Sequence, residues 1–315
     1  MVKKPKDKKL RIIIALILSI VVVVSIVVFK KYNEAESDWE VKLSDTGISP
    51  DSTSVKNSSE NGFTVDYIDV SQGDCALISC NGKNMLIDCA EAEYYEVVKN
   101  FLISKNIEHL DIVIASHPHS DHIGGMSLML EDFSVGMLLM PQIKDSEELN
   151  NDTYKIFLKA LENHSVNTRY AVNGDEFYLA DAKITILGPV KNSDEINNMS
   201  LVIMVEYGEN KLLFTGDMEK EAEKFLLDAK VNVDCDILKV SHHGSKDSSS
   251  IEFIQAASPK IAVISVSRYN EYNHPNGETL KNLLKEDVNV YRTDFDGTVS
   301  FYAESPDSEI VCLTK

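Results

Sequence analysis

His117-Pro118-His119-Ser120-Asp121-His122 places three histidines and one aspartate within six residues. The apolar residues 110–115 precede this cluster and predict a buried strand that stops at it. On an extended or turning loop the side chains of His117 and His119 point to the same side, so both imidazoles can reach one metal ion. Asp121 and His122 follow as the chain turns toward a helix, and they can reach a second ion.

Two further polar groups stand at the ends of predicted buried strands. Asp217 follows the strand predicted at 211–215, where its carboxylate could bridge two metals, although a lone strand-end aspartate is more often a turn former. His242 and His243 follow the strand predicted at 236–240. Imidazole and carboxylate ligands suit Zn²⁺, and Mn²⁺ is an option in a carboxylate-rich shell. The sequence therefore predicts two divalent ions, Zn²⁺ or Mn²⁺, at one sheet edge.

The rest of the chain from residue 62 onward alternates short β-branched runs with helical periodicity, in two similar halves. Strands first and helices afterwards suggest two sheets packed face to face with helices outside, an α/β sandwich of four layers, αββα. Strands are predicted at 63–70, 75–78, 84–88, 110–115, 183–187, 201–207, 211–215, 236–240 and 261–266. Helices are predicted at 93–105, 156–163, 219–229, 250–257 and 278–286.

The first 31 residues of the sequence differ in charge from the rest. Residues 1–31 hold eight of the 31 Lys and Arg and one of the 50 Asp and Glu, which leaves 23 basic and 49 acidic residues, net −26, in the remainder. Residues 10–29 are apolar except for Arg11, Ser19 and Ser25, and predict one transmembrane helix. The lysines before it place residues 1–9 in the cytoplasm and the body outside the cell membrane. A cleaved signal peptide is the alternative.

The remaining organisation follows from composition. Residues 30–61 are rich in Ser, Asp, Asn and Glu without clear periodicity and predict a flexible linker. Residues 62–315 are then expected to form one folded domain that contains the predicted metal site. Five cysteines with no CxxC spacing argue against a disulfide framework or a cysteine-type zinc site. A body this acidic repels polyanions, so a phosphate-bearing substrate must be held by local features such as a metal.

The motifs together resemble the metallo-β-lactamase superfamily, whose signature is His-x-His-x-Asp-His. Within it the chain is most similar to the extracytoplasmic domain of ComEC-type DNA-uptake proteins and their stand-alone relatives, although it lacks the long multi-span segments of such proteins. The resemblance extends over most of 63–302. The segments that carry it are 69–76 (DVSQGDCA), 116–125 (SHPHSDHIGG), 198–202 (NMSLV), 213–217 (LFTGD), 238–245 (LKVSHHGS), 264–265 with 273–275 (NHP), and 291–294 (YRTD).

The resemblance implies a role for each matching position. His117 and His119 would bind one metal, Asp121 and His122 the other, and Asp217 would bridge them. Of the adjacent histidines, His243 is preferred as a ligand because it directly precedes Gly-Ser, with His242 then facing the substrate phosphate. The opposite assignment stays open.

One departure concerns the first metal. Many members of the superfamily place a further histidine on it, between the cluster and Asp217. The only histidine in that interval is His164, within a helical pattern, and we expect it at the surface. The equivalent region reads Asn197-Asn198-Met199-Ser200, which makes Asn198 and Ser200 candidate substrate-binding residues. The first metal should therefore be under-coordinated, with water or substrate in the gap.

The catalytic candidates are Asp121, His242 and His274, of which the two histidines could hold a phosphate or protonate the leaving oxygen. A structural capping role for His274 is an equal alternative. Asp88, at the end of a predicted strand, is a candidate for steadying the histidine loop, with a turn or cap as its alternative.

These residues lead to a functional hypothesis. The leading one is a membrane-anchored phosphodiesterase or nuclease that cleaves a phosphodiester, DNA among the candidates, with a hydroxide shared by two metals. The alternatives are a hydrolase of a small phosphoester, ester or lactone at the cell surface, and a non-catalytic surface binding module. The sequence indicates no particular protein partner.

Overall fold

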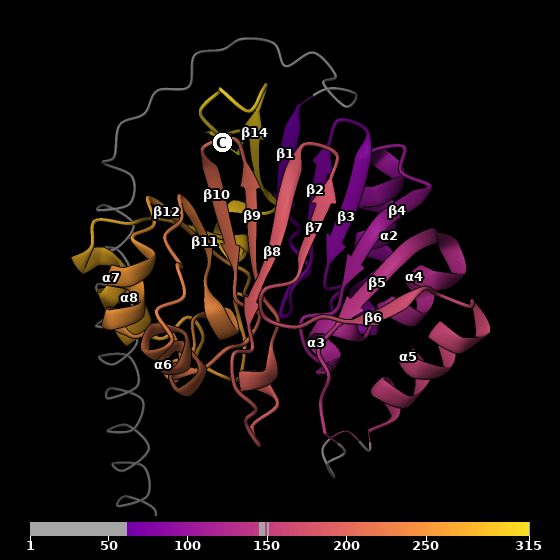
Figure 1. The fold of residues 1–315 in the computed structure, drawn as a ribbon, viewed down its shortest axis with the longest axis horizontal. Helices are drawn as coiled ribbons and strands as arrows, with labels where there is room; N and C mark the ends of the chain where they lie inside the picture. Colours follow the sequence, from indigo (N-terminus) through magenta and orange to yellow (C-terminus); the bar gives the residue numbers. More distant parts are fainter. Residues whose placement is uncertain (1–61, 145–148, 150, 315) are drawn as a thin grey trace, which may run out of the picture. The chain divides into compact units, whose positions relative to one another are not determined.

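The computed structural model describes residues 62–144, 149 and 151–314, which build two β-sheets. One sheet has eight strands in the order β15-β14-β1-β2-β3-β4-β5-β6, and the other has seven in the order β13-β12-β11-β10-β9-β8-β7. The two sheets lie face to face (Figure 1). The strands of the first sheet are β1 Phe63–Tyr67, β2 Ala76–Cys80, β3 Lys83–Ile87, β4 His109–Ile114, β5 Ser134–Met140, β6 Thr168–Tyr170, β14 Val299–Ala303 and β15 Val311–Cys312. Those of the second are β7 Glu176–Leu179, β8 Ala182–Gly188, β9 Val202–Tyr207, β10 Asn210–Phe214, β11 Ile237–Lys239, β12 Ile261–Ile264 and β13 Asn289–Arg292.

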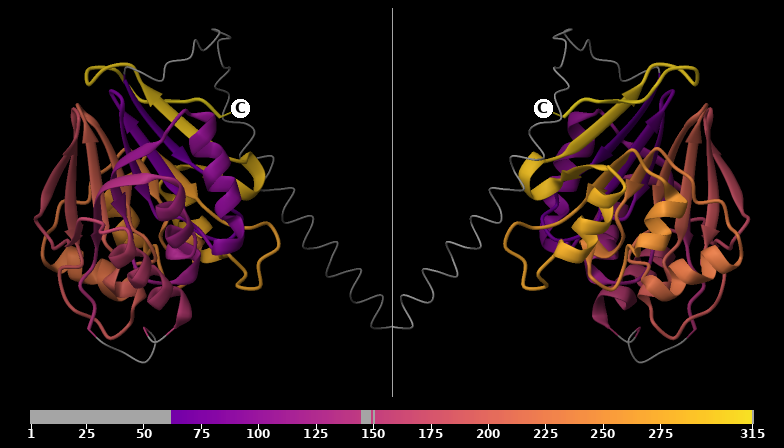
Figure 2. Two further views of the ribbon diagram at one scale, coloured as in Figure 1. Left: turned by 90° about the vertical axis from the view of Figure 1, so that its right-hand side faces the viewer. Right: turned by 90° about the vertical axis from the view of Figure 1, so that its left-hand side faces the viewer.

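Helices cover the outer faces of both sheets, as the two side views in Figure 2 also show. The first sheet is covered by α2 Tyr95–Ser104, α4 Met126–Asp132 and α5 Asp152–Asn163, and the second by α6 Lys220–Asp228, α7 Ile251–Ala257 and α8 Gly277–Lys285. Shorter helical turns are η1 Ala92–Tyr94, α3 Ser120–Ile123, η3 Asn197–Met199, η4 Ser241–Gly244 and α9 Thr293–Asp296. The predicted four-layer αββα arrangement is confirmed.

The core follows from the alternation of side chains along each strand. On β2, Ala76, Ile78 and Cys80 point into the layer between the sheets, whereas Leu77 points to the helices outside. Phe63 stacks on Tyr207 across the sheets with ring centroids 5.0 Å apart. Because both faces of the central strands are buried, these strands are apolar nearly throughout, as the sequence indicated.

Strand direction brings the site together. Strands β3, β4 and β5 are parallel neighbours in one sheet, and β10, β11, β12 and β13 are parallel neighbours in the other. Parallel strands end at the same sheet edge, so the loops after β4, β10 and β11 open at one end of the sandwich (Figure 1). Each of the predicted polar clusters lies in one of these loops.

The predicted elements agree with the observed ones to within a few residues, but several strands were not predicted. β5 contains Gly136 and begins at the exposed Ser134, which weakens its pattern. β7, β13, β14 and β15 are short or partly exposed and lie at or near sheet edges. The predicted tail 1–9, span 10–29 and linker 30–61 lie outside the described residues. Within the described ranges no helix is both long and apolar enough to cross a membrane.

A buried carboxylate ties two helices of the second sheet together and gives a stability prediction. Glu223 on α6 is fully buried, and its carboxylate accepts hydrogen bonds from the backbone N–H groups of Ser249 and Ser250 and from the Ser250 hydroxyl, at the start of α7. We expect Glu223→Ala to lower the free energy of unfolding by about 2 kcal/mol, because it leaves buried N–H groups without acceptors.

The measurement is urea denaturation of the variant beside Lys224→Ala. Lys224, on the same helix, forms only an exposed ion pair with Asp228, and its removal should cost about 0.5 kcal/mol or less. Equal midpoints for the two variants would contradict the prediction.

Candidate metal centre

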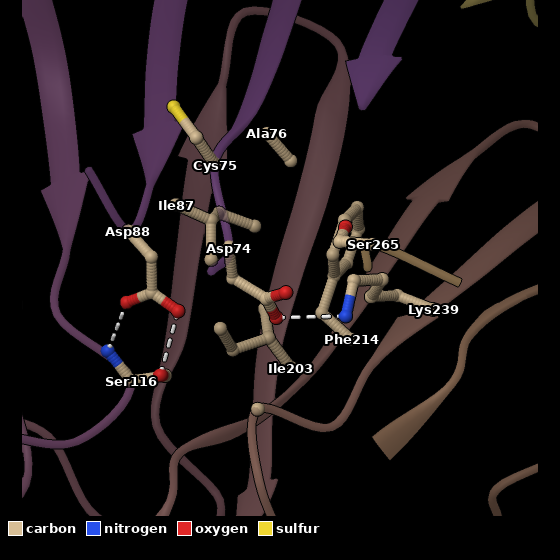
Figure 3. A pocket seen from close by; sticks show the side chains of 11 residues that line it. Asp74, Cys75, Ala76, Ile87, Asp88, Ser116, Ile203, Phe214, Lys239 and Ser265 are labelled. Carbon is tan, nitrogen blue, oxygen red and sulfur yellow. Dashed lines mark hydrogen bonds and ion pairs between the residues drawn. The ribbon is translucent and has the colours of Figure 1, made fainter. Parts of the chain in front are cut away.

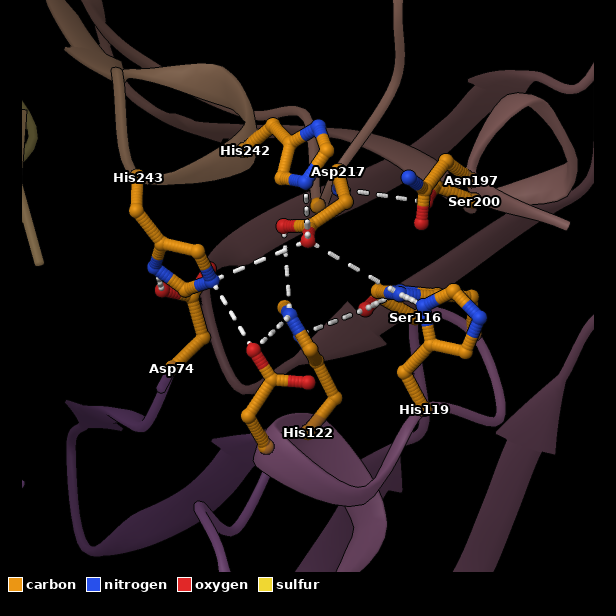
Figure 4. A network of polar contacts seen from close by, with 12 residues as sticks. Asp74, Ser116, His119, His122, Asn197, Ser200, Asp217, His242 and His243 are labelled. Carbon is orange, nitrogen blue, oxygen red and sulfur yellow. Dashed lines mark hydrogen bonds and ion pairs between the residues drawn. The ribbon is translucent and has the colours of Figure 1, made fainter. Parts of the chain in front are cut away.

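Three loops from the two sheets meet at the carboxyl ends of β4, β10 and β11. The loop after β4 carries His117 to His122, the turn after β10 carries Asp217, and η4 after β11 carries His242 and His243. Figure 4 shows their imidazoles and carboxylates pointing toward one another. The structure therefore brings together the residues that the sequence placed in separate clusters.

One group consists of Asp121, His122, Asp217 and His243, each of which offers a ligand atom within 4.8 Å of the others. His122 Nε2 lies 3.1 Å from Asp217 Oδ1, and His243 Nε2 lies 3.2 Å from Asp121 Oδ2. His122 and His243 are buried, as is Asp217. Four donors around a common point, from three different loops, are the arrangement that a single divalent ion requires.

A second group lies on the other side of Asp217. His117 Nε2 is 3.0 Å from His119 Nδ1 and 3.9 Å from Asp217 Oδ2. Asp217 presents Oδ1 to His122 and Oδ2 to His117, and Oδ2 also lies 3.6 Å from His243 Nε2, so the carboxylate is in reach of both groups. A carboxylate placed in this way can bridge two positions.

Two buried donor atoms of the described residues lack a hydrogen-bond partner, which also fits a metal ion at this position. His122 Nε2 and Asp217 Oδ1 are buried atoms without a well-formed hydrogen bond. Buried polar atoms in proteins nearly always have a partner, because an unpaired one costs about 1–3 kcal/mol. Two such atoms directed at one another, in a set of imidazole nitrogens and carboxylate oxygens, match the ligand chemistry of Zn²⁺ or Mn²⁺.

Asp88 holds the histidine loop from beneath (Figure 3). Its Oδ1 accepts from the backbone N–H of Ser116 at 2.7 Å, and its Oδ2 accepts from the Ser116 hydroxyl at 2.7 Å. Oδ2 also lies 2.8 Å from His122 Nδ1. Through this contact Asp88 holds the ring so that Nε2 faces Asp121 and Asp217. The predicted steadying position of Asp88 matches these contacts.

Asp74 and Lys239 form a second support that the sequence did not single out. Lys239, 3% exposed on β11, donates to Asp74 Oδ2 at 2.7 Å (Figure 3). The other oxygen of Asp74 is 3.4 Å from His243 Nδ1, which also contacts the backbone oxygen of Ser265 at 2.9 Å. Both residues lie in segments that carry the resemblance, 69–76 and 238–245, and a lysine within a buried apolar strand was a further signal.

A glycine permits the close approach of the Asp74 segment to the metal-binding loop. Gly73 has φ +135°, and a Cβ there would lie 2.6 Å from the backbone oxygen of Asp121. The next residue donates its N–H to that same oxygen at 3.0 Å. Only glycine allows this contact without displacing the loop.

The adjacent histidines occupy different environments. His243 is 1% exposed and belongs to the group around Asp217, which is the alternative that the sequence favoured. His242 is partly exposed, with Nε2 3.7 Å from Asp217 Oδ2 and Nδ1 3.5 Å from Glu219 Oε1. Both residues have positive φ, 50° and 52°, an unfavourable conformation for non-glycine residues that is typical of functional sites.

His274 lies at the edge of the site beside His242, with ring centroids 5.5 Å apart. Its Nδ1 is buried and makes no hydrogen bond within the described part of the chain. Burial, followed by the neighbouring charges of His243 and His242, lowers the pKa of His274 to about 4. A capping role through this side chain is not observed, and the imidazole is neutral at pH 7.

Asn198 and Ser200 require a correction, because their side chains point to the protein and not to a substrate. Asn198 is 3% exposed; its Oδ1 accepts from the Glu219 N–H at 3.0 Å and its Nδ2 donates to Glu221 at 3.2 Å. Ser200 is 1% exposed and accepts from the Asp217 N–H at 3.1 Å (Figure 4). Both side chains hold the turn that presents Asp217.

The histidine between the cluster and Asp217 does not join the site. His164 follows the last residue of α5 and lies 3.2 Å from the exposed Glu131. The group around His117 and His119 consequently has fewer protein donors than the group around His243.

Two effects set the pKa values in the site: burial disfavours the charged form of each group, and neighbouring opposite charges favour it. Burial disfavours a charged His122, but the carboxylates of Asp217, Asp88 and Asp121 outweigh it and raise its pKa well above the usual value. Burial likewise disfavours an ionised Asp217, but His122 and His243 hold its pKa well below the usual range. By contrast, burial and the nearby His122 lower the pKa of His117 well below 6.5. The carboxylates are therefore ionised at neutral pH, which is the form that binds metals.

Comparison with known proteins agrees with this geometry. The model of the metallo-beta-lactamase superfamily matches residues 68–148 and 197–268. ComE operon protein 3 of Bacillus subtilis is 33% identical over 256 residues, which cover 75% of this chain and 32% of that protein. Recombination protein 2 of Haemophilus influenzae is 30% identical over 248 residues, 78% of this chain and 29% of that protein. The match thus spans about a third of each relative.

Among solved structures, CmlA, a diiron β-hydroxylase from Streptomyces venezuelae, superimposes with a TM-score of 0.54 at 15% identity, over 74% of this chain and 53% of that one. A likeness at this identity concerns the fold alone. The two facing sheets, the histidine and aspartate cluster at their edge and the matched residues lead to one conclusion: the chain contains a metallo-hydrolase domain of the metallo-beta-lactamase superfamily.

Proposed function

We propose that this domain is a metal-dependent phosphodiesterase that cleaves DNA outside the cell. The position of Asp217 between two groups of imidazoles carries the proposal, because such a centre suits two divalent ions, Zn²⁺ or Mn²⁺, with Asp217 as the shared ligand. His117 and His119 would hold one ion, and Asp121, His122 and His243 the other. DNA is the proposed substrate because the relatives include a recombination protein and a competence protein.

Two ions held side by side supply a nucleophile at neutral pH and neutralise the negative charge that develops during attack on a phosphodiester. The chain's own residues arrange this chemistry. Asp88 and Asp74 fix the orientation of His122 and His243 from behind. The Ser200 hydroxyl fixes the Asp217 turn by accepting a hydrogen bond from the backbone N–H of Asp217.

His242 is the better placed of the two candidates for protonating the leaving oxygen. Burial lowers its pKa, but Glu219 and Asp217 outweigh burial and raise the pKa above the usual value for histidine. His274, neutral at pH 7, can donate a hydrogen bond to a phosphate oxygen but holds no proton to give up. We therefore assign proton donation to His242 and phosphate contact to His274.

The acidic surface favours a competing substrate class. The body outside residues 1–31 has a net charge of −26, which repels a long polyanion unless metals or local contacts offset it. A small phosphoester at the cell surface is therefore the second candidate. The apolar segment 10–29 supports our proposal that a single helix anchors the domain to the membrane, with residues 1–9 in the cytoplasm.

Metal binding can be tested without any substrate. We expect the purified full chain to bind two equivalents of Zn²⁺ or Mn²⁺, counted by elemental analysis after dialysis. His243→Ala should lose the ion held with Asp121 and His122, and His117→Ala should lose the other, so each variant should retain about one equivalent. Exposed His109→Ala serves as the control. Two retained ions in both variants would contradict the assignment.

Asp88→Asn tests the support of the histidine loop. Asparagine can still accept from Ser116, but its amide would face His122 Nδ1 in place of an acceptor. We expect roughly 10- to 100-fold weaker metal affinity with little loss of fold stability, measured by competition with a chromophoric chelator. Asp111→Asn, at an exposed ion pair with Lys83, is the matched control. An unchanged affinity would leave Asp88 with a purely structural role.

The substrate class can be tested by turnover of the metal-loaded chain. We expect cleavage of labelled DNA and of bis-p-nitrophenyl phosphate, and no cleavage of a chromogenic β-lactam. EDTA should abolish both activities and excess metal should restore them, because the nucleophile depends on the ions. Cleavage of the small diester but not of DNA would favour the small-phosphoester alternative. Turnover of neither would refute the phosphodiesterase assignment.

A further inference from the structure

The loop between β12 and α8 carries two exposed tyrosines at the edge of the metal centre. Tyr269 is 91% exposed and Tyr272 is 60% exposed. Soluble proteins do expose single apolar side chains, so exposure by itself has little meaning. These two tyrosines differ from scattered exposed side chains because they share one short loop beside the metal centre.

The loop is braced internally, which fixes the positions of its tyrosines. Asn270 donates to the backbone oxygens of Ser267 at 2.8 Å and of His274 at 2.6 Å, and it accepts from the His274 N–H at 2.9 Å. The Ser267 N–H donates to the side chain of Gln72 at 3.2 Å, which ties the loop to the segment between β1 and β2 of the other sheet. A braced loop that still exposes aromatic rings presents them at low entropic cost to a ligand.

Tyr272 is the outermost ring of a series that leads to the metal cluster. Its ring stacks on His274 with centroids 5.7 Å apart and an interplanar angle of 29°. His274 in turn lies 5.5 Å from His242 and 6.4 Å from His243, between ring centroids. A group bound to a phosphate at the centre would therefore reach Tyr272 within the length of one nucleotide unit.

The charge of the domain makes an aromatic contact valuable to a DNA substrate. Stacking on a ring does not depend on net charge, whereas the acidic body disfavours binding through the phosphates alone. Arg268, in the same loop, lies with its guanidinium 5.0 Å from the ring centroid of Phe295 and adds a local cation. Bases are available for stacking in single strands but are covered by their neighbours in a duplex.

We propose that Tyr272, assisted by Tyr269, is a stacking platform for a nucleobase next to the phosphodiester being cleaved, which makes the domain selective for single-stranded DNA. The proposal rests on the phosphodiesterase function proposed above. Tyr272 would be a specificity-determining residue, since it contacts the substrate away from the reacting atoms.

Two chromogenic diesters with the same leaving group separate this role from catalysis. Thymidine 5′-p-nitrophenyl phosphate carries a base, and methyl p-nitrophenyl phosphate does not. We expect Tyr272→Leu to raise KM for the thymidine compound roughly tenfold. The kcat for this compound, and both kcat and KM for the methyl compound, should stay within about twofold of the values for the unchanged protein. Tyr272→Phe should behave as the unchanged protein. Tyr178→Leu, an exposed tyrosine on β7, is the control. An equal effect of Tyr272→Leu on both diesters would overturn the platform.

A binding measurement tests the platform even if no turnover occurs. Fluorescence anisotropy of the Mn²⁺-loaded full chain would compare a six-nucleotide thymidine phosphorothioate with an abasic strand of the same length. We expect tighter binding of the thymidine strand, and loss of that difference in Tyr272→Leu. Turnover of neither diester would remove the proposed function, whereas equal binding of the two strands would remove the platform.

Discussion

The site depends on the contacts between the buried carboxylate of Asp217 and the imidazoles around it. The carboxylate is buried; its Oδ1 faces His122, and its Oδ2 lies between His117 and His243. Burying a carboxylate is costly unless cationic partners surround it. Around Asp217 they are imidazoles that are themselves buried, one with a raised pKa and one with a lowered pKa. A divalent ion in each group would supply positive charge on both sides of Asp217.

The two sheets fix the backbone positions of the turns that carry the candidate metal ligands. The ligands lie in turns after strands whose parallel neighbours fix their ends in space. The sandwich also holds two consecutive residues, His242 and His243, at positive φ through backbone hydrogen bonds from His242 to Gly216 and from Ser245 to His242. Strain of this kind, of order 1–3 kcal/mol per residue, persists only where the surrounding structure over-determines it. The stability of the two-sheet core is therefore a condition for the geometry of the site.

The sequence predicted the sandwich and the residues of the cluster because both depend on local patterns. Buried strands are apolar runs, and the histidines and Asp217 directly follow such runs. Asp74 and Lys239 could not be paired from the sequence, since 165 positions separate them and only the packing of the sheets brings them to 2.7 Å. Asn198 and Ser200 were assigned to substrate because motif position does not reveal side-chain direction. Strands β7, β13, β14 and β15, at or near the sheet edges, were not predicted because they are short or partly exposed, and few buried residues mark them.

The difference between the two groups bears on where a substrate enters. His243 and the Asp74–Lys239 pair surround the group near Asp121 with protein atoms. On the other side, Asn198 and Ser200 turn inward to hold the Asp217 turn, and His164 lies just after α5 beside Glu131. The ion held by His117 and His119 would therefore have the fewer protein ligands and the more open coordination. The side of His117 and His119 would thus leave the more room for a substrate group to bind.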